Sequence, residues 1–268
     1  MKLSYVVSTH ETSFTSVASG NLENKVRIIA SLGYDGVELA IRDPGMLDVS
    51  SIRTLLKKCG LQLAAIGTGQ AYVDEGLFFS STDAGITKQA IERIKGHIDL
   101  AAQFESQVIV GLLRGEGIKN KFFSADQFKK SLREICAYAE KKNTRIVIEP
   151  INRYETSLIN CVQEALDIIQ EINSASLYIL ADTFHMNIEE QQLPSTLTIA
   201  APKLAHVHIA DSDRWYPGHG HIDFEAIVTT LKQINYQGFL SGEMLPKPDF
   251  ETAAKKTIQY MKDKITRY

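Results

Sequence analysis

Eight short apolar runs alternate with stretches of helical periodicity along the chain, and this alternation is the feature that most constrains its fold. The apolar runs lie at 2–7, 36–41, 61–67, 107–113, 145–149, 177–182, 204–210 and 238–244. Helical periodicity covers 22–32, 49–59, 85–104, 126–142, 162–173, 192–200, 223–234 and 250–266. Near-continuous apolar strands that alternate with amphipathic helices are typical of a parallel sheet.

The count of elements predicts a single (β/α)₈ TIM barrel of the α/β class that spans residues 1–268. Glycines in SLGYDG (31–36) and KKCGLQ (57–62) follow two of the helical stretches, where a left-handed cap is expected. A doubly wound open sheet is the alternative. It is disfavoured because no GxGxxG follows the first strand, and GTGQAY (67–72) is a weak nucleotide signal.

Charge and composition exclude several classes of protein. The net charge is −3 and no basic block occurs, which argues against a partner that binds through its phosphate backbone, so no nucleic-acid partner is expected. The three cysteines include no CxxC pair, so neither a disulfide framework nor a thiolate zinc site is expected, and a cytoplasmic location fits best. No signal peptide and no run of 18 apolar residues is present, so no membrane association is expected.

Ionisable residues gather where four successive strands are expected to end, which is where TIM barrels carry their active sites. These residues are Glu149, Asp182, His208 and Glu243. Carboxylates that converge at a barrel mouth repel one another, and a divalent cation would relieve this repulsion. The alternative is that each acid pairs with a nearby arginine. Four ligand-type residues at four neighbouring strand ends favour the metal site.

The sequence HVH (206–208) places two histidines on one face of a strand, because side chains alternate along it. Only His208, nearer the carboxyl end, is expected to reach the metal, and His206 is expected to form hydrogen bonds one layer deeper. Three carboxylates and one imidazole suit Mn²⁺, with Co²⁺ or Mg²⁺ as alternatives.

Four segments of the chain resemble the ketose 3-epimerases of the xylose-isomerase-like TIM-barrel superfamily, which include D-tagatose and D-psicose 3-epimerases. The segments are IEPINRYE, LADTFHMN, HVHIADSDRWYPGHG and SGEML, and the resemblance covers essentially the whole chain. It implies that Glu149, Asp182, His208 and Glu243 bind the metal, and that Glu149 and Glu243 are the catalytic pair. It also implies that Glu155, His185 and Arg214 bind the substrate. Dimers or tetramers are common in this family, so a homo-oligomer is expected.

Within this family, IRDP (41–44), GTGQAY (67–72), GLLRG (111–115) and ADTFHMNIEE (181–190) most resemble a 5-keto-L-gluconate epimerase branch. This resemblance implies conversion of 5-keto-L-gluconate to D-tagaturonate. A keto-sugar acid needs a partner for its carboxylate, and Arg114 in GLLRGEG is a candidate, with a salt bridge to Glu116 as the alternative. Tyr72 is a candidate wall of the substrate pocket.

The chemistry of the predicted site fits epimerisation next to a ketone. Inverting the carbon requires one base on each face of the substrate, and Glu149 and Glu243 lie on strands far enough apart to flank it. An aldose–ketose isomerase or a hydroxypyruvate isomerase could use the same groups, so the distal pocket has to distinguish these reactions. An endonuclease IV-type repair enzyme shares the barrel but would need a basic groove. A non-catalytic sugar-binding barrel gives no reason for two glutamates at opposing strand ends.

Overall fold

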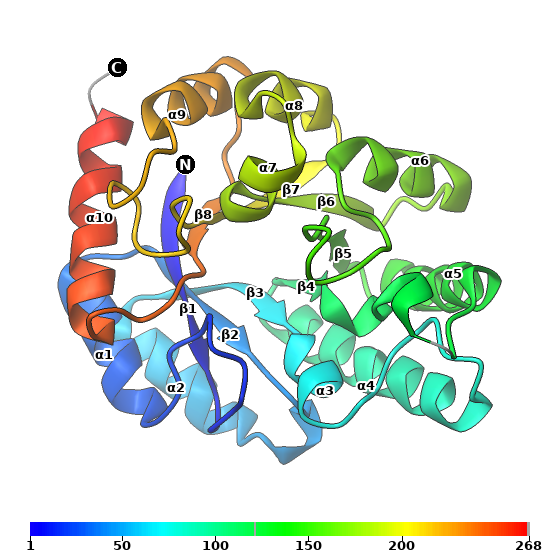
Figure 1. The fold of residues 1–268 in the computed structure, drawn as a ribbon. Coiled ribbons are helices and arrows are strands. Elements are labelled where there is room, and N and C mark those ends of the chain that lie inside the picture. Colours follow the sequence, from blue (N-terminus) through cyan, green and yellow to red (C-terminus); the bar gives the residue numbers. More distant parts are fainter. Residues whose placement is uncertain (121, 267–268) are drawn as a thin grey trace.

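A computed structural model describes residues 1–120 and 122–266, and its centre is a closed barrel of parallel strands in the order β1 to β8 (Figure 1). Every strand pairs with its neighbour in sequence, and β1 closes the barrel against β8. The strands are β1 (Lys2–Ser8), β2 (Gly36–Ala40), β3 (Gln62–Gly67), β4 (Gln107–Val110), β5 (Arg145–Ile148), β6 (Leu177–Asp182), β7 (Leu204–Ile209) and β8 (Phe239–Gly242). The predicted TIM barrel is therefore confirmed.

Helices surround the barrel, and each of the eight predicted helical stretches forms a helix with ends within one residue of the prediction (Figure 1). They are α1 (Leu22–Leu32), α2 (Val49–Cys59), α4 (Ala84–Gln103), α5 (Ala125–Lys141), α6 (Val162–Ile172), α8 (Leu193–Ala200), α9 (Phe224–Gln233) and α10 (Phe250–Thr266). Two short helices that the periodicity did not reveal, α3 (Gly69–Val73) and α7 (Thr183–Glu189), directly follow β3 and β6. None of the described helices is long and apolar enough to cross a membrane.

Two predicted glycine caps have the expected left-handed backbone. Gly33 ends α1 with φ 84°, and Gly60 ends α2 with φ 67°. The Asn21 side chain accepts a hydrogen bond from the Asn24 amide at the start of α1, and Asp48 does the same for the Ser51 amide at α2. These local signals explain why the helix ends could be placed from the sequence.

Five strands end before the apolar runs do, by one residue in β2, β5 and β7, by two in β8 and by three in β4. The predicted strand 107–113 ends at Val110, and Leu112–Arg114 form a short 3₁₀ helix, η2. β5 ends at Ile148 and β8 at Gly242, so Glu149 and Glu243 each directly follow a strand. Glu149 and Glu243 therefore belong to the loops that begin at the barrel mouth.

The interior of the barrel changes from apolar to polar toward its carboxyl end. Val147 and Leu180 belong to a small buried cluster with Ala65 and Ile109. Val147 lies two residues before Glu149, and Leu180 lies two residues before Asp182, so each shares a strand face with an acid. This apolar cluster therefore lies in the layer below these two acids.

Candidate metal and substrate site

Glu149, Asp182, His208 and Glu243 converge at the barrel mouth, as the sequence predicts. One ligand atom from each residue lies within 4.8 Å of the others, and all four side chains are buried. Nδ1 of His208 lies 3.4 Å from Oε1 of Glu149, 3.8 Å from Oδ2 of Asp182 and 3.7 Å from Oε2 of Glu243. The ends of β5 to β8 thus direct three carboxylates around one imidazole nitrogen.

Three of the converging atoms are buried without a hydrogen-bond partner, namely Oε1 of Glu149, Oδ2 of Asp182 and Nδ1 of His208. An unsatisfied buried polar atom costs about 1–3 kcal/mol, and charged groups cost more. A single divalent cation would satisfy all three atoms together and offset the repulsion among the carboxylates. The residues present therefore fit a buried divalent-metal site.

Glu38 on β2 supports His208 from below and was not foreseen from the sequence. Its carboxylate is 1% exposed and lies 3.0 and 3.1 Å from Nε2 of His208 and 2.8 Å from Nε2 of His206. Because Nε2 of His208 donates to this carboxylate, Nδ1 is left as the lone-pair nitrogen that faces the cluster. An acid within the otherwise apolar strand GVELA was the only signal that could have revealed it.

His206 lies one layer below His208, as expected, and is fully buried. Its Nε2 faces Glu38, and its Nδ1 lies 3.0 Å from the amide nitrogen of Gln107. Both ring nitrogens therefore have partners within the barrel. Although Glu38, His206 and His208 form a second group of ligand-type residues, their mutual hydrogen bonds leave no need for a second cation.

The electrostatics of the cluster favour a positive charge at its centre. Burial lowers the pKa of His208, but the carboxylates of Glu38 and Glu243 outweigh this and raise the pKa well above its ordinary value. Burial raises the pKa of Glu243, the His208 imidazole opposes this shift, and Glu149 reinforces it. The same field that would hold a proton on His208 would attract a cation.

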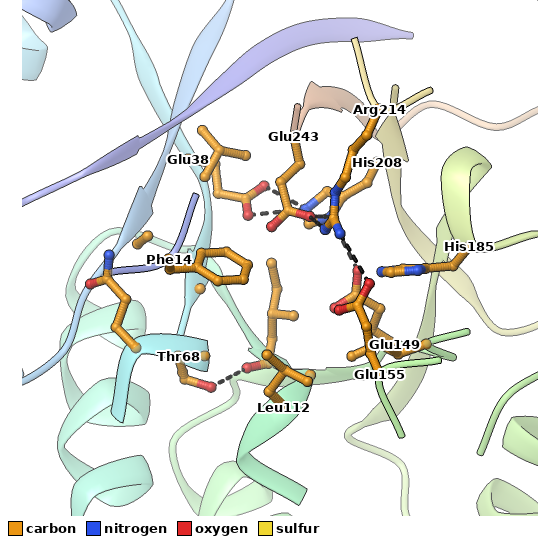
Figure 2. Close-up of a pocket in the computed structure, with 18 residues that line it drawn as sticks. Phe14, Glu38, Thr68, Leu112, Glu149, Glu155, His185, His208, Arg214 and Glu243 are labelled. Carbon is orange, nitrogen blue, oxygen red and sulfur yellow. Dashed lines mark hydrogen bonds and ion pairs between the residues drawn. The ribbon is translucent and has the colours of Figure 1, made fainter. Parts of the chain in front are cut away.

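Arg214 links the metal cluster to the substrate side of the pocket (Figure 2). Its guanidinium donates to Oε1 of Glu155 at 3.1 Å and to Oε2 of Glu243 at 3.2 Å. Arg214 has φ 61°, a left-handed backbone conformation that is strained for a non-glycine residue. The backbone amide of Arg214 donates to the Asp211 carbonyl at 2.8 Å, and its carbonyl accepts from the Leu245 amide at 2.8 Å. These two backbone hydrogen bonds hold the strained conformation in place.

His185 reaches the same space from the start of α7. Its Nδ1 accepts a hydrogen bond from the Asn152 side-chain amide at 2.8 Å, so Nε2 carries the hydrogen. The same Asn152 amide donates to Oε1 of Glu155 at 2.9 Å, which couples the two predicted substrate-binding residues. Glu155, His185 and Arg214 therefore lie together at the pocket, as their positions in the sequence motifs suggested.

Arg114 does not occupy the position expected of a carboxylate partner. It is fully buried in η2, and its guanidinium donates to the backbone carbonyls of Glu149 and Ile159. The early end of β4 at Val110 turns Arg114 behind the Glu149 backbone and away from the cavity. Both roles expected for this side chain, binding a carboxylate and pairing with Glu116, are thus replaced by contacts with the backbone.

Tyr72 also lies away from the pocket lining. Its hydroxyl hydrogen bonds to Oε1 of Glu116 at 2.5 Å, and its ring packs edge-on against Phe78. The Glu116 carboxylate, the alternative partner predicted for Arg114, therefore accepts a hydrogen bond from Tyr72 instead. This contact connects α3 to the loop after β4 outside the cavity.

The pocket above the metal cluster has a second, uncharged wall. Figure 2 shows Phe14, Thr68 and Leu112 across from the ionisable residues. Gln70, in the first turn of α3, completes this wall. None of these four residues was identified as a site residue from the sequence. Phe14 and Thr68 lie in loops, Gln70 lies in a short helix, and Leu112 was expected within a strand.

The chain is similar to known proteins over nearly its whole length. The family model described as Xylose isomerase-like TIM barrel matches residues 26–264. An L-ribulose 3-epimerase from Methylomonas sp. (strain DH-1) is 31% identical over 219 residues, which is 80% of this chain and 75% of that protein. A 3-dehydro-D-guloside 4-epimerase from Escherichia coli K12 is also 31% identical, over 83% of this chain and 87% of that protein.

Solved structures agree with this similarity. A D-allulose 3-epimerase from Methylomonas sp. in complex with D-allulose has a TM-score of 0.80 and 25% identity, over 98% of this chain and 97% of that chain. A D-psicose 3-epimerase determined in the presence of D-fructose has a TM-score of 0.84 at 20% identity, over 99% of both chains, and so supports the fold.

Proposed function

The chain belongs to the xylose isomerase-like TIM-barrel family and, within it, to the ketose 3-epimerases, and we propose that it inverts C3 of a ketose with Glu149 and Glu243 as the acid–base pair. By homology it is a carbohydrate epimerase of the isomerase class. The observation that carries the proposal is the convergence of two glutamates, one after β5 and one after β8, on Nδ1 of His208 at one buried, metal-fitting point.

We propose that Glu149, Asp182, His208 and Glu243 hold the cation, with Mn²⁺ as the preferred metal because the set combines three carboxylates with one imidazole. When bound, this metal polarises the substrate carbonyl and makes the neighbouring C–H more acidic. Its binding is supported by the three unpartnered ligand atoms.

The two glutamates divide the proton transfers between the two faces of the substrate. One carboxylate removes the C3 proton, and the other, in its protonated form, delivers a proton to the opposite face; the roles exchange in the reverse direction. Burial and the nearby Glu149 carboxylate raise the pKa of Glu243, which favours one shared proton between the pair.

Arg214, Glu155 and His185 orient the substrate in this scheme. Arg214 holds Glu155 and Glu243 in fixed relation, and the Nε2–H of His185 is directed by Asn152 to serve as a donor. A group held in place before the reaction loses little entropy at the transition state. These residues would therefore keep C3 between the two carboxylates.

Deuterium incorporation from D₂O tests the reaction type. The Mn²⁺-loaded enzyme is incubated with ketoses, and the label is located by NMR after the metal is removed. Deuterium at C3 of the epimeric product is expected, because the delivered proton comes from a glutamate that exchanges with solvent. Label at C1 or C2 would instead identify an aldose–ketose isomerase, and no exchange with any ketose would refute the proposal.

The finer substrate assignment, 5-keto-L-gluconate to D-tagaturonate, stays a prediction from the motifs. Arg114, which was expected to bind the carboxylate of such a substrate, instead donates to the backbone carbonyls of Glu149 and Ile159. Homo-oligomerisation and a cytoplasmic location also stay predictions. Light scattering of the purified protein would measure the oligomeric state.

A further inference from the structure

Gln70 lines the substrate pocket, and its side chain contains a buried acceptor atom that has no hydrogen-bond partner. The residue is 1% exposed and lines the pocket. Its Nε2 donates to the Ser8 hydroxyl at 2.8 Å, whereas its Oε1 has no hydrogen-bond partner. A buried amide oxygen without a partner is costly, and a ligand hydroxyl would remove that cost.

The orientation of the Gln70 amide follows from its neighbours. The Ser8 hydroxyl hydrogen is committed to the His10 carbonyl at 2.5 Å, so Ser8 can offer Gln70 only an acceptor. The amide must therefore turn its NH₂ group to Ser8 and leave its carbonyl oxygen free. A reversed amide would place two oxygens in contact with no hydrogen between them.

Thr68, two residues earlier, has the same polarity. Its hydroxyl donates to the Ile109 carbonyl at 2.7 Å (Figure 2), which leaves only lone pairs on the oxygen. Thr68 is 1% exposed and also lines the pocket. The two polar side chains of this wall, Thr68 and Gln70, therefore offer hydrogen-bond acceptors, which attract hydroxyl groups and repel a carboxylate.

The charged wall, which carries Glu149, His208, Arg214 and Glu243, has no unbalanced positive charge for a carboxylate either. Arg214 is the only arginine or lysine among the pocket-lining residues that the structure describes. Its two terminal nitrogens donate to Glu155 and Glu243, whose carboxylates balance its charge, and only its Nε lacks a hydrogen-bond partner. Four glutamates line the same pocket, and a divalent metal would balance only part of their charge. An anionic substrate would thus enter a pocket without surplus positive charge.

We propose that Gln70 is a specificity-determining residue that accepts a hydrogen bond from a substrate hydroxyl remote from the reacting carbons, and that it selects neutral ketoses over keto-sugar acids. This inference rests on the proposed ketose epimerase function. It assigns the choice of substrate to the first turn of α3, outside the metal cluster.

Three matched substrates test the proposal with the Mn²⁺-loaded enzyme: a ketohexose, the same sugar with its terminal CH₂OH oxidised to a carboxylate, and its 6-deoxy analogue. Wild type should show kcat/KM at least about tenfold higher for the ketohexose than for the acid. Gln70→Leu should lose about tenfold on the ketohexose and much less on the 6-deoxy sugar. Gln70→Glu should decrease kcat/KM for the acid further.

Gln163→Leu on the exposed face of α6 is the matched control and should leave all three values unchanged. A wild-type preference for the acid would overturn the proposal. An equal loss on the ketohexose and the 6-deoxy sugar in Gln70→Leu would overturn it too, because Gln70 would then have only a structural role.

Calorimetric binding of the same sugars separates the two hypotheses. If wild type binds the ketohexose in preference to the acid, and Gln70→Leu loses that preference, the selectivity stands even when no C3 exchange occurs. Exchange at C3 without any binding preference would retain the epimerase and reject the role of Gln70. Binding of none of the sugars would reject both.

Discussion

The two walls of the substrate pocket differ in origin and in chemistry. The wall formed by the ends of β5 to β8 carries Glu149, His208 and Glu243, whose positions are set by the strand register and by contacts such as that of Glu38. The opposite wall consists of Phe14, Thr68, Gln70 and Leu112, from loops, α3 and η2. Strand ends thus position the reacting groups. Substitutions in the loop wall can change which substrate binds without displacing those groups.

Removing either base from the charged wall should have the largest effect. Glu149→Gln and Glu243→Gln are each expected to decrease the rate of C3 deuterium exchange by about 10³-fold or more, because an amide cannot accept the proton. Metal content is measured in the same samples, and Glu251→Gln on the exposed face of α10 serves as control. A variant that retains kcat and changes only KM would contradict the two-base scheme.

Removing the metal tests whether the charged wall is stable alone. A metal at 100 times its Kd stabilises the fold by about 2.7 kcal/mol, which is about 5–10 °C in Tm for a chain of this size. Chelation should therefore lower Tm by about that amount, and Mn²⁺ should restore it, as measured by calorimetry. A Tm that responds to neither treatment would argue against metal binding at this cluster.

Glu38→Gln tests the support beneath the charged wall. The amide can present its NH₂ group to the Nε2 edge of His208, so the imidazole orientation is no longer enforced. Metal affinity should fall about 10- to 100-fold, as measured by calorimetric titration. At saturating metal, kcat should largely recover. Glu92→Gln, exposed on α4, is the control, and equal affinities in the two variants would assign Glu38 a purely structural role.

Leu112→Ala tests the uncharged wall and should have the smallest effect. Loss of apolar contact should raise KM by about 3- to 10-fold and leave kcat nearly unchanged, because such contacts bind substrate and transition state alike. Leu166→Ala, partly buried on α6 away from the pocket, controls for general destabilisation. A large decrease in kcat would show that the two walls are not separable in function.

Residues of the charged wall could be located from the sequence because local patterns suffice to find them. Glu149, Asp182, His208 and Glu243 lie at or just beyond the ends of apolar runs, and parallel strands in a barrel bring their carboxyl ends to one rim. Their convergence then follows from the fold class, without knowledge of any individual contact.

Arg114 illustrates where local pattern fails. The apolar run QVIVGLL suggested a strand to residue 113, which would have left the next residue at the barrel mouth. The backbone departs from the strand at Gly111, and the guanidinium instead binds the carbonyls of Glu149 and Ile159. These carbonyls belong to a segment 35 and 45 residues away, so no local pattern could have identified them.

The sequence by itself determined the barrel, its eight longer helices and the four residues expected to hold a metal, because periodicity, caps and strand ends are local properties. Tertiary structure alone decided that Glu38 contacts a histidine 170 positions away, that Arg114 binds backbone carbonyls, and that the Gln70 amide oxygen is left without a partner. The reason is physical: a hydrogen bond in a buried site depends on which distant group lies within about 3 Å.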